Sequence, residues 1–308
     1  MCLILMHNYF HSIQGFLSNR RVGISILFLA IACRLIQLLF FFNIRVDASY
    51  QAIASLNMVN GHGISLSSAS PSNLSHTIYE PLIKWPPGFS LLLAPFYLLF
   101  GNYLYAAMAL HAIAAIALIL FSRGILKLLN TPIYLVNIFT LLTGVFIYSY
   151  YIITSTDAIG VSFFIAAIYF FISLVRSQEK WARDLPGITV CLLACGLLKY
   201  LYIPVVMILP MMLWFRGWIN KNLLLKKAGI YSGLITLLGV LAMLGFQEYS
   251  GGSPVYIHEP ERGFFPGNLL SFHPFTITSF IDNNTIINLT GIDPMHLFRV
   301  IHFGLYLV

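Results

Sequence analysis

Residues 84–101 read KWPPGFSLLLAPFYLLFG, and residues 45–50, earlier in the same polar stretch, read RVDASY. This stretch follows a long apolar run at 22–42, so it is the first polar segment that the chain reaches after crossing a membrane. The run at 87–101 begins with proline and glycine and is too short for a full span, which needs roughly 20 residues. We expect it to form an interfacial or re-entrant helix that does not cross.

The composition places the chain among membrane proteins. Of its 308 residues, 59% are hydrophobic and 9% are charged, whereas soluble domains contain roughly 25% charged residues. The formal net charge of +7 does not indicate a nucleic-acid partner, because membrane proteins concentrate Lys and Arg in their inner loops. The sequence therefore predicts an all-α polytopic membrane protein.

The other apolar runs define the expected spans. Seven runs are interpreted as crossings: 22–42, 103–122, 132–151, 158–175, 186–198, 201–215 and 229–246. The pair at 186–198 and 201–215 is short, so we expect half-length or tilted spans whose junction is buried in protein or faces a cavity. We divide the chain into a transmembrane module at 1–256 and a segment at 257–308, which would hold an outer loop and the start of a truncated further span.

The distribution of basic residues supports this layout if the N-terminus is cytoplasmic. Eleven Lys and Arg residues then lie in inner segments: Arg20, Arg21, Arg123, Lys127, Arg176, Lys180, Arg183, Arg216, Lys221, Lys226 and Lys227. The outer segments hold four: Arg45, Lys84, Lys199 and Arg262. An excess of Lys and Arg in cytoplasmic loops is the usual signature of membrane orientation. If 87–101 crossed, every later basic loop would change sides, so the charge pattern indicates that it does not.

This layout brings four ionisable residues to the outer face, although they are far apart in the sequence: Asp47, Lys84, Asp157 and Lys199. An ionisable group near hydrocarbon costs on the order of 2.5–3.5 kcal/mol on insertion scales, so such groups normally face a cavity or a partner. Two carboxylates and two ammonium groups at one rim indicate a site for an anionic, partly lipidic substrate. The lysines would meet a phosphate as point charges, and an aspartate could act as a general base.

Each of these residues also has an alternative, structural role. Asp47 could cap a helix or pair with Arg45, and Asp157 could cap a helix that begins at Ala158, because Asp is a favoured N-cap. The two lysines of the set could simply extend along apolar surface to reach water. Arg34, inside the first span, is expected to be a structural charge that faces the bundle.

The remaining reactive side chains form no recognisable metal or redox site. His7 and His11 are one helical turn apart but lie in the N-terminal tail, and other histidines are scattered in outer loops. Cys191 and Cys195 lie within an apolar run, where thiols are usually core residues. We therefore expect no metal site, no disulfide framework and no cofactor, and no residue pattern supports a requirement for a divalent cation.

Several short motifs follow one another in a specific order. After the aspartate that follows the first span come Gly-His-Gly at 61–63, KWPPGFSLLLAP at 84–95, Thr-Ser-Thr-Asp at 154–157, Leu-Leu-Lys-Tyr at 197–200 and Gly-Ser-Pro at 252–254. This order resembles the GT-C glycosyltransferases, over about residues 20–256. It is most similar to the bacterial, glycosyltransferase family 39-like branch that contains protein O-mannosyltransferases and lipid A aminoarabinose transferases.

The resemblance implies a GT-C-like helical core of about seven spans, with a large first outer loop at 43–101 that carries short interfacial helices. It implies an enzyme of the plasma (inner) membrane that moves a hexose or pentose from a polyprenyl-phosphate carrier to a lipid, glycan or protein acceptor on the outer, periplasmic face. The expected site consists of Asp47 as catalytic base, Lys84 and Lys199 as donor-phosphate ligands, and Asp157, Tyr50 and Tyr200 as further site residues.

Two departures from the family pattern bear on this expectation. Gln247-Glu248-Tyr249 stands where many relatives have Arg-Asn, so donor contacts from that side would differ. The chain is also short for the family, many of whose members have eleven or more spans and a C-terminal outer domain. Two other function classes fit the same charges: a transporter or flippase of a lipid-linked or anionic solute, and a non-catalytic subunit that binds the carrier lipid.

Overall fold

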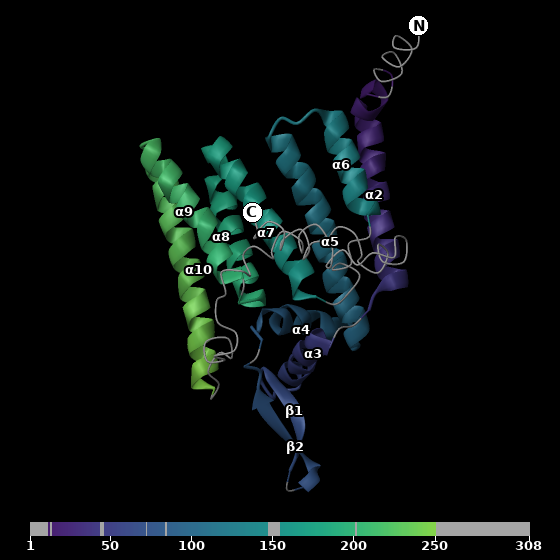
Figure 1. Ribbon diagram of the computed structural model, residues 1–308, viewed down its shortest axis with the longest axis vertical. Helices are drawn as coiled ribbons and strands as arrows, with labels where there is room; N and C mark the ends of the chain where they lie inside the picture. Colours follow the sequence, from purple (N-terminus) through teal and green to yellow (C-terminus); the bar gives the residue numbers. More distant parts are fainter. Residues whose placement is uncertain are drawn as a thin grey trace, which may run out of the picture.

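The protein forms a helical bundle with a small hairpin at one end. The computed structural model describes residue 12 and residues 14–43, 46–71, 73–83, 85–146, 155–200 and 202–250, without the side chains of Val46, Asp47 and Gln178. The elements are α2 (Arg20–Phe41), α3 (Val46–Val59), β1 (Ser65–Ser70), β2 (Asn73–Pro81), α4 (Gly88–Phe100), α5 (Tyr103–Leu128), α6 (Ile133–Val145), α7 (Thr156–Arg176), the short 3-10 helix η2 (Gln178–Lys180), α8 (Trp181–Leu198), α9 (Tyr202–Ile219) and α10 (Leu223–Tyr249). We call the end that carries α3, α4, β1 and β2 the hairpin end, and the other the opposite end (Figure 1).

The long helices of the bundle stand side by side; α5, α7 and α9 run toward the opposite end, and α2, α8 and α10 run toward the hairpin end (Figure 1). Among the described residues, six helices are long and apolar enough to cross a membrane: α2, α5, α7, α8, α9 and α10. The structure thus confirms a multi-pass helical arrangement. The span expected at 132–151 is represented by α6, which has 13 residues and falls short of spanning length; residues 147–151 of that run lie outside the described ranges.

Of the two alternatives for 186–198 and 201–215, half-length or tilted spans, helices α8 and α9 show that half-length is wrong. Each has 18 residues, because the helices continue beyond the apolar runs at 186–198 and 201–215. The first turn of α8 includes the charged pair Arg183 and Asp184, in which Arg183 Nε donates to Asp184 Oδ1 over 2.7 Å. The negative charge of Asp184 in the first turn also interacts favourably with the positive end of the helix dipole. The sequence prediction counted only apolar residues, so it began the span at 186 and left out the charged first turn, which is part of the helix.

The segment between α2 and α5 contains two short helices and an antiparallel hairpin. Strands β1 and β2 pair with Leu66 opposite Glu80 and Ser67 opposite Tyr79, a small β element that the all-α expectation missed. Helix α4 lies across the end of the bundle (Figure 1). Its 13 residues span about 20 Å, less than the roughly 30 Å of a hydrocarbon core. This agrees with the expectation that 87–101 is too short to cross.

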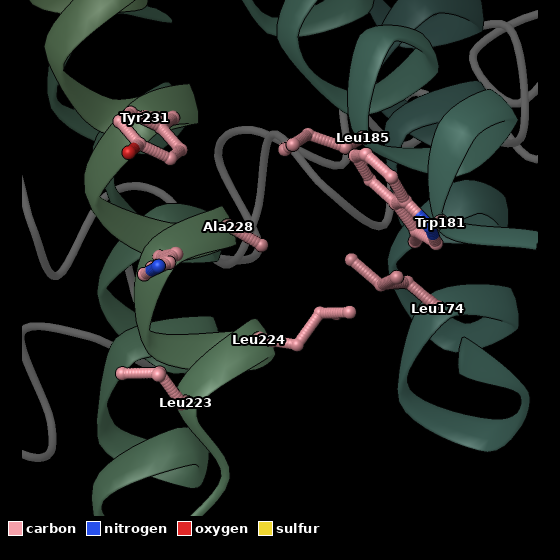
Figure 2. Close-up of a pocket in the computed structure, with 8 residues that line it drawn as sticks. Leu174, Trp181, Leu185, Leu223, Leu224, Ala228 and Tyr231 are labelled. Atoms are coloured by element: carbon pink, nitrogen blue, oxygen red, sulfur yellow. The ribbon is translucent and has the colours of Figure 1, made fainter. Parts of the chain in front are cut away.

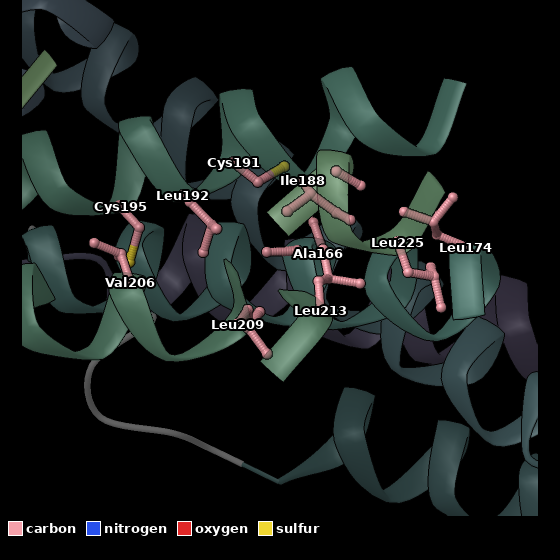
Figure 3. Packing of buried hydrophobic residues seen from close by; sticks show 12 residues of the cluster. Ala166, Leu174, Ile188, Cys191, Leu192, Cys195, Val206, Leu209, Leu213 and Leu225 are labelled. Carbon is pink, nitrogen blue, oxygen red and sulfur yellow. The ribbon is translucent and has the colours of Figure 1, made fainter. Parts of the chain in front are cut away.

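The two largest clusters of buried side chains among the described residues hold the bundle together. The first joins α7, α8, α9 and α10, with Leu192, Leu209 and Leu213 among its members (Figure 3). Cys191 and Cys195 are buried in the same cluster, which confirms them as core residues. The second cluster joins α3, α4 and α5 to Ile159 of α7 and Leu198 of α8, and therefore lies beneath the hairpin end.

A polar contact anchors the short helix α6 to α2. Arg34, 1% exposed, donates to the carbonyl of Thr143 and to Gln37 Oε1 over 2.8 Å. Gln37 Nε2 donates to the Val145 carbonyl over 2.8 Å. Because the last four carbonyls of a helix have no intrahelical partner, these side chains cap α6. Arg34 is therefore a structural charge that faces the bundle, as expected from the sequence.

Candidate functional site

Four segments that are distant in sequence meet at the hairpin end. They are residues 83–88, the start of α7, the junction between α8 and α9, and the last turn of α10. Direct contacts join them: the junction bonds to the start of α7, and the last turn of α10 bonds to the backbone at Trp85. The bundle topology thus brings together the polar residues that the sequence separates by up to 162 positions.

Asp157 is the centre of a polar cluster at the start of α7. Lys199 Nζ lies 2.7 Å from Asp157 Oδ1, and the Tyr202 hydroxyl donates to the same oxygen over 3.0 Å. The side chains of Lys199 and Asp157 remain 39% and 32% exposed. Two of the residues predicted for the site, Asp157 and Lys199, are therefore in direct contact and accessible.

The alternative role of Asp157 as a helix cap is wrong. Helix α7 begins at Thr156, and its N-cap is Ser155, whose hydroxyl accepts the backbone N–H of Asp157 over 3.0 Å. Since Ser155 supplies the cap, the carboxylate of Asp157 is available for Lys199. Lys199 likewise bonds a carboxylate instead of extending alone to water.

Tyr200 and Gln247 hold the backbone on both sides of Lys84. The Tyr200 hydroxyl lies 2.7 Å from Gln247 Oε1 and 3.3 Å from the carbonyl oxygen of Ile83. Gln247 Nε2 donates to the carbonyl of Trp85 over 3.1 Å, and Gln247 is 1% exposed. Gln247 is therefore a buried support for the segment that carries Lys84. Lys84 itself lies outside the described residues.

Tyr50 connects α3 to the same segment. Its ring stacks on that of Trp85, with centroids 5.1 Å apart and planes 17° apart. Asp47 precedes Tyr50 by three residues in α3, nearly one helical turn. The side chain of Asp47 is outside the described part of the structure, so its predicted role stays a prediction.

His111 is a site-forming residue that the sequence reasoning missed. It is fully buried in α5, its Nδ1 lies 2.9 Å from the Ala107 carbonyl, and its Nε2 accepts the Ser155 backbone N–H over 3.1 Å. This pattern assigns the ring proton to Nδ1 and makes His111 a positioning residue for the cap of α7. A polar residue inside the apolar run 103–122 was the available signal, because buried polar groups in spans need partners.

Groups of side chains suited to a metal ion were not found in the part of the chain that the structure describes. Within this part, His111 is committed to two backbone groups and Asp157 to Lys199 and Tyr202. The described cluster at the hairpin end is thus built from an ammonium group, a carboxylate and hydroxyl groups, a set that suits binding of a phosphate and movement of a proton.

Gly88 fixes the start of α4 against α8. A Cβ added at Gly88 would lie 2.4 Å from the Leu197 carbonyl oxygen, so Gly88→Ala must push the two backbones apart. We expect a loss of about 1–3 kcal/mol in stability, as for other overpacked sites, measured as a lower thermal unfolding temperature in detergent. Gly245→Ala is the matched control, because a Cβ there meets nothing within 4 Å; equal unfolding temperatures for the two variants would refute this close packing.

Comparisons of the chain with protein-family models, with curated proteins and with solved structures give no match. The likeness to GT-C transferases therefore depends on the motifs in the sequence. The geometry at the hairpin end provides an independent basis for a functional proposal.

Proposed function

We propose that the protein is a membrane glycosyltransferase that moves a sugar from a polyprenyl-phosphate carrier to an acceptor. The observation that carries the proposal is the meeting of the Asp157–Lys199 pair, the 83–88 segment and α3 at one end of an apolar bundle. A carrier of this kind combines a long apolar chain with a phosphate, and the site combines apolar helices with the partly exposed ammonium group of Lys199.

Lys199 is suited to hold the donor phosphate. Its ammonium group has three N–H donors, and the contact with Asp157 Oδ1 uses one of them. A partly exposed ion pair of this kind contributes little stability by itself, about 0–1 kcal/mol. Asp157 therefore orients the ammonium group without preventing it from donating to a phosphate oxygen. In the proposal, Lys84 approaches the same phosphate from the segment that Tyr200 and Gln247 support.

The proposed reaction is an inverting displacement at the anomeric carbon. Asp47 takes the proton of an acceptor hydroxyl as its oxygen forms a bond to that carbon. The bond between the anomeric carbon and the phosphate oxygen breaks, and its electron pair remains on the leaving polyprenyl phosphate. Lys84 and Lys199 stabilise the negative charge that develops on this phosphate. The products are a glycosylated lipid, glycan or protein and the free carrier.

The proposal places this chemistry on the outer face of the plasma membrane. The opposite end of the bundle carries Lys127 and Arg176 in the last turns of α5 and α7, and Arg216 in the last turn of α9. Basic residues of this kind concentrate on the cytoplasmic side. If the opposite end is cytoplasmic, the hairpin end faces outward.

Binding of undecaprenyl phosphate tests the proposal directly. We expect native mass spectrometry to show a bound lipid on the full chain, and Lys199→Gln to weaken binding about tenfold or more, because charge-assisted hydrogen bonds are lost. Lys127→Gln, in the last turn of α5 at the opposite end, is the charge-matched control and should bind as the wild type does.

A density map of the complex in lipid nanodiscs completes this test. Phosphate density between Lys84 and Lys199 would support the transferase. Equal affinity of Lys199→Gln and wild type, or a continuous polar path that joins the two ends of the bundle, would refute it; the path would favour a transporter.

A further inference from the structure

A pocket lies at the opposite end of the bundle, remote from the polar cluster around Asp157. It has a volume of about 480 Å³, within the roughly 300–1,000 Å³ of small-molecule sites. Its walls come from the end of α7, the start of α8 and the start of α10: Leu174, Trp181, Leu185, Leu223, Leu224, Lys227, Ala228 and Tyr231. Figure 2 shows Leu174, Trp181 and Leu185 on one side, facing Leu224 and Ala228 of α10 on the other.

The inner walls of this pocket are apolar. Leu174 and Ala228 are 0% and 2% exposed and belong to the core cluster of α7 to α10, against which Leu185 and Leu224 also pack. The pocket therefore reaches from the surface to the hydrophobic core. Walls of this kind suit a hydrocarbon chain, because they present few polar groups that would be left without hydrogen-bond partners beside it.

The mouth of the pocket, formed by Trp181, Lys227 and Tyr231, is polar and aromatic instead of aliphatic. Trp181 and Tyr231 are 51% and 53% exposed, and both residue types are enriched at membrane–water interfaces. Lys227 is the one charged side chain among the described residues that line the pocket. The pocket thus combines a hydrocarbon-compatible interior with a positive charge at an interfacial rim.

The charge around the mouth is positive as well. Arg176 and Lys180 lie just before α8, and Lys226 is the neighbour of Lys227 in α10. Glu179 of η2 is an exposed carboxylate beside Lys180 and offsets one of these cations. Asp184 in α8 is buried and accepts from Arg183, so the surroundings of the mouth remain positive. An anionic headgroup would be attracted to this end by about 1 kcal/mol per basic residue near the surface.

We propose that this pocket binds one acyl chain of an anionic phospholipid, with the headgroup phosphate on Lys227. A free phosphate ion would use the lysine but would leave the apolar walls empty. A zwitterionic phospholipid such as phosphatidylcholine would bring a phosphate, but also a trimethylammonium group that Lys227 and the neighbouring cations repel. An anionic phospholipid uses both the walls and the lysine, and the six helices of spanning length place the pocket where such lipids are the solvent.

Native mass spectrometry of the full chain, titrated with phosphatidylglycerol or phosphatidylcholine, tests this site. We expect phosphatidylglycerol to bind more tightly, and Lys227→Gln to weaken its binding about fivefold. Lys226→Gln removes the same charge from the adjacent position, which does not line the pocket, and should have a smaller effect. Equal effects of the two substitutions, or equal binding of the two lipids, would overturn the proposal.

A second variant tests the apolar walls at unchanged charge. Leu224→Trp fills the pocket from its α10 side, so we expect it to weaken phosphatidylglycerol binding; wild-type binding by this variant would contradict acyl-chain insertion. Displacement of the lipid by an excess of inorganic phosphate would likewise identify a phosphate site and refute the lipid site. Lys199→Gln should not affect phosphatidylglycerol binding, which separates this pocket from the proposed transferase site.

Discussion

Asp47→Asn is expected to lower the rate of sugar transfer at least about a hundredfold. A positioned general base contributes typically 10²–10⁴-fold to a rate, and asparagine has a similar shape but cannot take the acceptor proton. The measurement is the turnover number with radiolabelled polyprenyl-phosphate hexoses and pentoses, with acceptor and donor at saturation. The binding of undecaprenyl phosphate should be nearly unchanged, because Asp47 acts on the acceptor in the proposed mechanism.

Glu80→Gln is the matched control for this experiment. Glu80 is an exposed carboxylate in β2 of the same segment between α2 and α5, and the proposed mechanism gives it no role. We expect Glu80→Gln to retain wild-type turnover. Wild-type turnover in a folded Asp47→Asn variant would remove Asp47 from the mechanism, even if the donor-binding experiment succeeds.

Arg34→Ala is expected to destabilise the bundle by on the order of 3 kcal/mol. The substitution leaves the Thr143 carbonyl and Gln37 Oε1 without their donor, and a buried polar group that loses its partner costs about 1–3 kcal/mol. Removal of a buried charge can offset such a loss by relieving desolvation. Here the acceptors remain buried in the bundle, where water cannot replace the guanidinium, so we expect destabilisation to dominate.

Thermal unfolding in detergent measures this effect. We expect Arg34→Ala to lower the unfolding temperature by at least about 5 °C, and Arg34→Lys to have an intermediate effect, since lysine keeps the charge but lacks the planar fork. Arg21→Ala is the control in the same helix, because Arg21 is exposed. An unfolding temperature of Arg34→Ala equal to that of Arg21→Ala would show that the contact does not anchor α6.

The features that the sequence predicted well depend on length and polarity. The 87–101 run is too short for a span, and α4 indeed has 13 residues. Arg34 is a charge inside an apolar run, so it had to find buried partners. The placement of Asp157 and Lys199 at one end of the bundle also followed, because both residues flank apolar runs on the same side; their direct ion pair was not predicted.

The features that were missed depend on contacts between segments. Gln247 is ordinary in its local sequence, and its hydrogen bond to Trp85 spans 162 positions. His111 lies within an apolar run and acts through the backbone of Ser155. The hairpin of β1 and β2 is rich in serine, a residue with weak strand preference compared with β-branched and aromatic residues. In each case the structure depends on the segment that the residues contact, and the residues' own local sequence does not reveal that contact.

The close approach of Gly88 to the Leu197 carbonyl has a mechanical consequence. At that point the backbones of α4 and α8 are in direct contact, with no side chain between them to absorb a displacement. Lys199 lies two residues after Leu197 and is the C-cap of α8, which ends at Leu198. A molecule that shifted α4 when it bound at the hairpin end would therefore also displace the ammonium group of Lys199. In the proposed mechanism, binding of the acceptor would then be coupled to binding of the donor phosphate through this one backbone contact.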